Sequence, residues 1–181
     1  MSQRKLARVC ALGALALPAL AFAHPGHGND AGFVTGFEHP FEATDHLFAL
    51  IAVGLLAGRL GGRAAAMLVG VALTLMALGL GAGYLGMQLP RVGGFTMIVI
   101  AVCAVLILAP PRRMVGAIVA VAAAFAFFSG MAHGEWILPG AEGWAFAAGF
   151  LLASAATIGV GSLAATLWQR RLMARAPRSG T

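Results

Sequence analysis

The sequence has little charge and little cysteine. Of its 181 residues only 10% are Asp, Glu, Lys or Arg, whereas 60% are hydrophobic. A soluble globular domain is about a quarter charged, so this composition excludes an ordinary soluble fold and indicates an integral membrane protein. The chain has two cysteines, Cys10 and Cys103, and the first lies in a predicted export signal. Cys103 would then remain alone, which excludes an intramolecular disulfide in the mature chain.

Recognisable catalytic and nucleic-acid motifs are also missing. The sequence has no Gly-x-Ser-x-Gly nucleophile elbow and no His-Glu-x-x-His metal motif, so a membrane enzyme is only a third alternative. The formal net charge of +6 comes from short basic clusters between apolar runs. That distribution is typical of membrane topology and not of a DNA-binding surface. We therefore expect neither an enzyme nor a nucleic-acid partner.

The apolar runs predict an all-α polytopic membrane bundle. Residues 1–23 have a basic start, an apolar run and a final Ala21-Phe22-Ala23, which is typical of a cleaved signal peptide. We expect residues 24–43 to form a periplasmic leader rich in histidine and acid, and residues 169–181 a basic cytoplasmic tail. Between them, residues 44–168 are expected to form the transmembrane helical bundle, with about five mature spans. The predicted spans are 44–60, 64–87, 94–109, 114–132 and 144–168.

Glycines and small polar residues occur at several positions within these predicted spans. We expect a tight turn at 59–63, and close packing or an irregular turn at the glycine-rich end of the second span. Glycine pairs four residues apart let helix backbones approach closely, and in-span Ser and Thr residues usually hydrogen-bond one helix to another. The pairs are Gly54/Gly58, Gly79/Gly83 and Gly130/Gly134, and the polar residues are Thr74, Thr96, Ser129, Ser154 and Thr157.

The basic residues predict the orientation. Five spans that start outside put the clusters at 59–63, 112–113 and the tail inside, and only Arg91 of the basic residues falls in an outer loop. This agrees with the positive-inside rule. We therefore expect a bacterial inner-membrane protein with a periplasmic mature N-terminus and a cytoplasmic C-terminus. The same topology places all five histidines and all six acidic residues on or near the outer face.

A cluster of histidines and carboxylates directly precedes the first apolar run of the mature chain. Pro40 favours the first position of a helix, and a helix that starts there places His39, Glu42 and His46 near one stripe. Imidazole mixed with carboxylate suits borderline divalent ions such as Ni²⁺, Co²⁺ or Zn²⁺. The alternative is a helix N-terminus whose acidic residues complement the helix dipole. The cluster consists of Glu38, His39, Glu42, Asp45 and His46.

Further candidate ligands lie outside this cluster. His133 and Glu135 belong to a distant segment that the predicted topology brings to the same face, where they would complete the site. Cleavage after Ala23 would leave His24 as the N-terminus, so that its α-amine and imidazole, with His27 close by, would chelate a metal. The alternative for this leader is a flexible polar segment.

Two sequence patterns resemble motifs of the HupE/UreJ family of bacterial membrane proteins. His39 is followed after five residues by Asp45-His46, as in the first family motif. Residues 128–136 resemble the second, Phe-His-Gly-x-Ala-His-Gly-x-Glu, and residues 149–154 resemble the start of the last family span. The resemblance covers nearly the whole mature chain. It implies an accessory protein of hydrogenases or ureases that transports nickel or cobalt.

The chain departs from the family pattern at four positions. Ser129 replaces the first histidine of the second motif and Trp136 its glutamate, while Ile158 replaces a histidine of the last span and Ala43 a common glycine. The ligands deeper in the membrane are thereby reduced to His133. The complete set of candidate metal ligands is His39, Asp45, His46 and His133, with support from Glu42, Glu135, His24 and His27.

These observations lead to one expected function and one alternative. We expect membrane transport of a divalent transition metal, nickel or cobalt, for urease or hydrogenase maturation. The expected partners are the ion as cargo, the lipid bilayer and the maturation proteins, with no tightly bound cofactor. The alternative is a periplasmic-facing sensor or accessory interaction protein that binds the metal without translocating it. The missing histidines at positions 129 and 158 favour that alternative.

Overall fold

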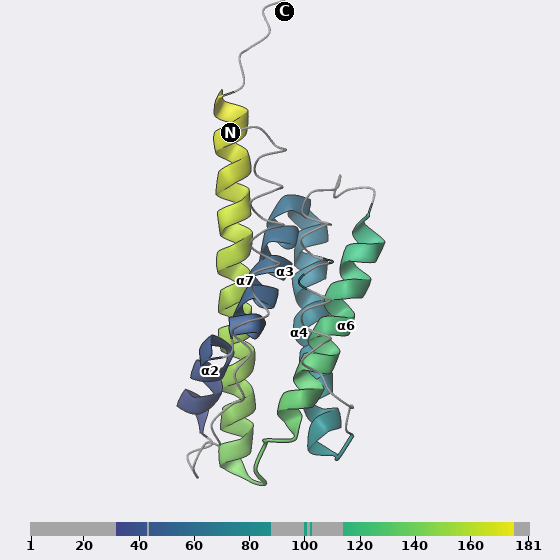
Figure 1. Cartoon of the computed structure of the whole chain (residues 1–181), viewed down its shortest axis with the longest axis vertical. Coiled ribbons are helices and arrows are strands. Elements are labelled where there is room, and N and C mark those ends of the chain that lie inside the picture. Colours follow the sequence, from purple (N-terminus) through teal and green to yellow (C-terminus); the bar gives the residue numbers. More distant parts are fainter. Residues whose placement is uncertain (1–31, 43, 88–99, 101, 103–113, 176–181) are drawn as a thin grey trace, which may run out of the picture.

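The computed structural model describes residues 32–42, 44–87, 100, 102 and 114–175. All regular structure in these residues is helical, as the sequence predicts, and no strand occurs among them. Figure 1 shows the helices gathered side by side into one elongated bundle. The helices are α2 (Phe33–Glu42), α3 (Thr44–Leu60), α4 (Gly62–Tyr84), α6 (Val115–Gly134) and α7 (Ala141–Arg175).

Three of these helices are long and apolar enough to cross a membrane, namely α4, α6 and α7. Helices α2 and α3 pass the same test only as a pair, with an angle of 85° between them. The described residues thus contain three candidate spans, or four if the bent pair forms one broken span. The predicted span at 94–109 lies outside the described residues except for positions 100 and 102. The predicted signal peptide, residues 1–23, also lies outside them.

The expectation that Pro40 opens the helix is wrong. Pro40 lies inside α2, close to its C-terminal end, and a second helix begins at Thr44. A proline within a helix removes one backbone hydrogen bond and crowds the carbonyl four residues earlier, so it weakens the last turn of α2. His39 and Glu42 consequently belong to α2 while His46 belongs to α3. They do not form one continuous helical stripe.

Close packing of α3 against α7 depends on two of the predicted glycines. A Cβ atom at Gly54 would collide with the backbone carbonyl of Ile158, and one at Gly58 with the carbonyl of Ser162. Because both contacts advance by four residues on each helix, α3 and α7 run in the same direction. The absence of side chains lets the two backbones touch.

The pair formed by α4 and α6 is built in the same way, and it confirms the other two predicted glycine pairs. Each glycine faces a backbone carbonyl of the opposite helix at a distance that excludes a Cβ atom. Both helices run in the same direction, from upper to lower in Figure 1. This parallel arrangement is what an intervening span at 94–109 requires, although that span stays a prediction. The contacts are Gly79 with Phe127, Gly83 with Met131, Gly130 with Met76, and Gly134 with Leu80.

The predicted tight turn at 59–63 is confirmed. Gly61 is the single residue between α3 and α4, and Gly61 and Gly62 have φ angles of +66° and +51°. Only glycine adopts such angles without steric cost, so the chain reverses here within one residue. This reversal sets α3 antiparallel to α4, as Figure 1 shows.

Helix α7 is longer than the others, with 35 residues. At ~1.5 Å per residue it is roughly 52 Å long, whereas the hydrocarbon core of a bilayer is ~30 Å thick. Figure 1 shows its C-terminal turns standing beyond the ends of α3, α4 and α6. The beginning of the predicted basic tail, including Arg170 and Arg171, therefore continues the helix up to Arg175.

Candidate metal-binding site

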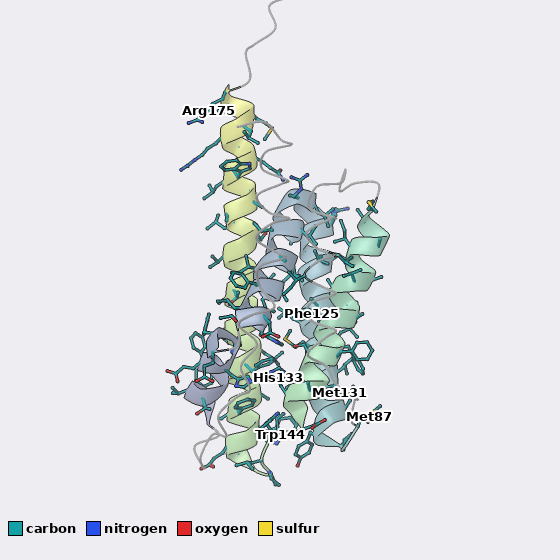
Figure 2. All side chains as sticks on the ribbon, viewed as in Figure 1. Met87, Phe125, Met131, His133, Trp144 and Arg175 are labelled. Carbon is teal, nitrogen blue, oxygen red and sulfur yellow. The ribbon has the colours of Figure 1, made fainter. Side chains whose placement is uncertain are left out.

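Three histidines from three different helices meet inside the bundle. The ring centroid of His133 on α6 lies 4.8 Å from that of His39 on α2 and 4.7 Å from that of His46 on α3. All three residues are less than 10% exposed. In Figure 2, His133 lies in the lower half of the bundle, below Phe125 and away from the Arg175 end. The structure thus brings the two distant segments together.

Local helix geometry orients His133. Side chains in a helix lean toward its N-terminus, and the ring of His133 reaches back one turn, where its Nδ1 lies 2.7 Å from the backbone oxygen of Ser129. Since a carbonyl oxygen only accepts, Nδ1 is the donor, and in a neutral ring Nε2 carries the lone pair. Histidines that bind metals are commonly fixed by such a bond from the second ring nitrogen.

Ser129 joins two of the three histidines. Its Oγ lies 2.6 Å from His46 Nε2, while its backbone oxygen accepts the bond from His133. The serine is only 3% exposed. The sequence marks Ser129 as an in-span hydroxyl that is expected to bond one helix to another. The related family has a histidine at this position. Its spacing of four residues from His133 was the signal that it faces the same site.

Phe150 on α7 belongs to the candidate site although it was not among the residues expected there. Its ring is stacked on His133 with a centroid distance of 4.8 Å, and it lies 5.9 Å from the His46 ring and 6.2 Å from the His39 ring. Phe150 is fully buried. One aromatic side chain therefore packs against all three imidazoles. The only signal in the sequence is that Phe150 falls within residues 149–154, which resemble the start of the last family span.

The candidate carboxylates lie toward the outside of this histidine cluster. Glu42 Oε2 is 3.8 Å from His39 Nδ1, and the Glu42 side chain is 46% exposed. Asp45 is half-buried in the first turn of α3, where its charge complements the helix dipole. Glu135 is exposed at the C-terminal cap of α6, and Glu38 is exposed on α2. His24 and His27 lie outside the described residues.

The cluster lies deeper than the surface position that the sequence suggested. Gly130, the residue after Ser129, packs against Met76 of α4. Met76 is two turns before the last residue of α4, Tyr84, so the contact between Ser129 and His46 lies roughly 12 Å inside that end of the helix. An ion at His46 would be well within the bundle.

The ring of His133 contacts each of the other two histidine rings edge to face. The interplanar angle is 77° between His39 and His133 and 71° between His46 and His133. Among the described residues, no group of three or more His, Cys, Asp or Glu side chains has its donor atoms arranged around a common metal position. The ring nitrogens would have to turn toward one point for all three histidines to ligate the same ion.

Comparison with known proteins identifies a matching family and a similar protein, but no similar solved structure. The family model described as HupE / UreJ protein matches residues 12–180 of this chain. Protein HupE of Rhizobium leguminosarum bv. viciae is 34% identical over 143 residues, which are 79% of this chain and 74% of that protein. No solved structure matches.

Proposed function

Because this chain belongs to the HupE/UreJ family, we propose that it carries a divalent transition metal, nickel or cobalt, inward across the bacterial inner membrane. The ion would serve the maturation of urease or hydrogenase. The observation that carries this proposal is the meeting of His39, His46 and His133, all buried, from three separate helices. The proposal assigns no catalysis to the chain.

The donor chemistry favours a borderline transition metal as cargo. Neutral imidazole nitrogens suit Ni²⁺, Co²⁺ and Zn²⁺, whereas Mg²⁺ and Ca²⁺ prefer shells of oxygen ligands. The contacts of His133 with His39 and with His46 bring three such nitrogen-bearing rings into one buried part of the bundle, which supports a borderline metal ion as the cargo.

The exposed carboxylate indicates the direction of entry. Glu42 stands beside His39 with its side chain half in solvent, so it would attract a cation and deliver it to His39. His133 and His46 would receive the ion further inside. Asp45, half-buried at the start of α3, and Glu135, exposed at the end of α6, would add negative potential around this entrance.

The break between α2 and α3 supports transport over static binding. Transporter sites are commonly formed where a membrane helix is discontinuous, because the interrupted ends can rearrange around the ion. Here the break falls between His39 on α2 and His46 on α3. A small change in the 85° angle between these helices would move the two imidazoles relative to each other. Such weak and adjustable ligation lets an ion leave as well as enter.

The test is nickel accumulation by cells at low external nickel concentration. We expect the wild-type protein to raise accumulation and His46→Ala or His133→Ala to abolish most of that increase. Thr166→Val is the matched control, because the Thr166 hydroxyl already donates to the carbonyl of Ser162. The amount of each variant in the membrane is measured in parallel. Equal accumulation by the wild type and a properly inserted His39/Asp45/His46 triple alanine variant would refute the proposal.

A second candidate function is a metal sensor or accessory protein that binds the ion without moving it. The observation in its favour is Ile158, which stands where the related family has a histidine and is a fully apolar, buried side chain at 1% exposure. The two functions differ in one result. A sensor would bind nickel as a purified protein but would leave cellular accumulation unchanged.

A further inference from the structure

Helix α7 contains a buried hydroxyl group that forms no hydrogen bond with the helix itself. Ser154 is 0% exposed, and its Oγ has no hydrogen-bond partner among the described residues. Two other hydroxyls of the same helix behave differently. Thr157 Oγ1 donates to the carbonyl of Ala153 at 2.9 Å, and Thr166 Oγ1 to the carbonyl of Ser162 at 2.8 Å. Bonding to the carbonyl one turn back is the usual solution for a helical hydroxyl in apolar surroundings.

The packing register places Ser154 directly beyond the histidine cluster. Along α3 and α7, the ring of His46 contacts the ring of Phe150, and Gly54 meets Ile158. Each step of four residues on α3 corresponds to a step of four on α7. Ser154 therefore lies level with Leu50, one helical turn or roughly 6 Å further from the entrance than His46.

The side chains that this register expects near the level of Ser154 on α3, α6 and the next turn of α7 are apolar. Leu50 is fully buried, Phe125 is 2% exposed with its ring 5.6 Å from that of His46, and Ile158 is 1% exposed. An ion that leaves His46 toward the Arg175 end must pass this apolar layer. The Ser154 hydroxyl provides a polar oxygen within the layer, and its lone pairs are not engaged by α7.

We propose that Ser154 is the next contact of the transported divalent ion after His46 and His133. Its Oγ would act as an oxygen ligand to the ion or accept a hydrogen bond from one of the ion's water molecules. The inference rests on the proposed transport function and adds a residue to its path. A buried hydroxyl without a partner lowers stability relative to alanine, so packing against the described residues does not explain a serine at this position.

The test compares Ser154→Ala with the matched control Thr157→Val. Both changes remove one buried hydroxyl from α7, but only the Thr157 hydroxyl is bonded within the helix. We measure the maximal rate of nickel uptake, the external concentration that gives half this rate, and the midpoint of thermal unfolding of each purified protein. Equilibrium dialysis with Ni²⁺ alone measures binding to each purified protein.

For Ser154→Ala we expect the maximal uptake rate to fall roughly fivefold, the factor that corresponds to one ordinary hydrogen bond. Nickel binding to the purified protein and the half-saturating concentration should stay unchanged, and the unfolding midpoint should not fall. Thr157→Val should match the wild type in uptake. An equal uptake rate in Ser154→Ala and wild type, an equal loss in both variants, or a loss explained by a lower unfolding midpoint would overturn the assignment.

The same measurements separate this inference from the transport function. If the wild type accumulates nickel above the His46→Ala variant while Ser154→Ala equals the wild type, only the role of Ser154 fails. If the wild type accumulates no more than His46→Ala, transport fails and the role of Ser154 fails with it.

Discussion

Ser129 Oγ lies 2.6 Å from His46 Nε2, so a hydroxyl on α6 is joined directly to an imidazole on α3. The backbone oxygen of the same serine accepts a bond from His133 Nδ1 at 2.7 Å. One residue thus orients two histidines that come from opposite halves of the chain. Ser129 thus links two rings of the candidate site, although a serine is not itself a preferred ligand of nickel.

We predict that Ser129→Ala weakens both the bundle and the site. The buried His46 ring would lose its bond to α6, at a cost of about 1–3 kcal/mol in unfolding free energy. Loss of a residue that orients a metal ligand also lowers affinity, and we expect roughly a tenfold weaker binding of Ni²⁺. Equilibrium dialysis and thermal unfolding of the purified protein measure the two effects. Unchanged affinity in Ser129→Ala would show that His46 is held by other contacts.

A second prediction concerns Phe150, which touches all three imidazoles. Phe150→Leu keeps an apolar side chain but removes the stacking on His133. Such an aromatic pair contributes about 0.5–1.5 kcal/mol to stability beyond the burial of its surface. We expect a lower unfolding midpoint and a loss of nickel affinity. Leu152→Ala is the control, because Leu152 lies on the same helix and is 53% exposed. If both variants bind nickel equally well, Phe150 is only a packing residue.

A third prediction separates glycines that carry helix contacts from those that do not. A Cβ atom at Gly79 would strike the carbonyl of Phe127, whereas one at Gly70 on the same helix meets nothing within 4 Å. Gly79→Ala should lower the unfolding free energy by about 1–3 kcal/mol through overpacking. Gly70→Ala should be neutral or stabilising, since alanine favours a helix over glycine by about 1 kcal/mol. Equal unfolding midpoints would place α6 further from α4 than the structure has it.

The fourth prediction is the orientation in the membrane. Single cysteines placed at Ala141 and at Ser179, in a background without the native cysteines, should differ in their reaction with a membrane-impermeant reagent. Because the arginine clusters favour the cytoplasmic side, we expect labelling of intact cells only at position 141. Labelling at position 179 would reverse the proposed direction of metal entry.

Much of the fold could be predicted from the sequence because membrane helices are determined by local composition. The low charge and long apolar runs give the class, and they place α4 and α6 within three residues of their observed bounds, whereas α7 begins three residues earlier and ends seven residues later than predicted. The glycine pairs also mark real contacts, since a missing side chain permits close approach wherever a partner helix arrives. The glycine pairs do not, however, identify the helix that packs against each of them.

Part of the candidate site could be predicted as well. His39, His46 and His133 were chosen by residue type and by spacing, and the structure brings them together. Asp45 is half-buried and Glu135 exposed, each within two residues of one of these histidines in the chain. The prediction that a metal binds there stays a prediction. Spacing along one chain identifies suitable donors, but it carries no information on the distances between them.

Only the tertiary structure decided how the donors are held. Pro40 lies inside a short helix that packs on α7 and ends before α3 begins, whereas local preference alone favoured a helix start at that proline. The contact of Ser129 with His46 and the stacking of Phe150 on His133 join residues far apart in sequence. Such contacts arise from the register in which helices pack, and backbone approach at glycines sets that register. The sequence by itself therefore determined the membrane class, the apolar spans and the types of donor, while the packing of α2, α3, α6 and α7 decided the depth and orientation of each imidazole.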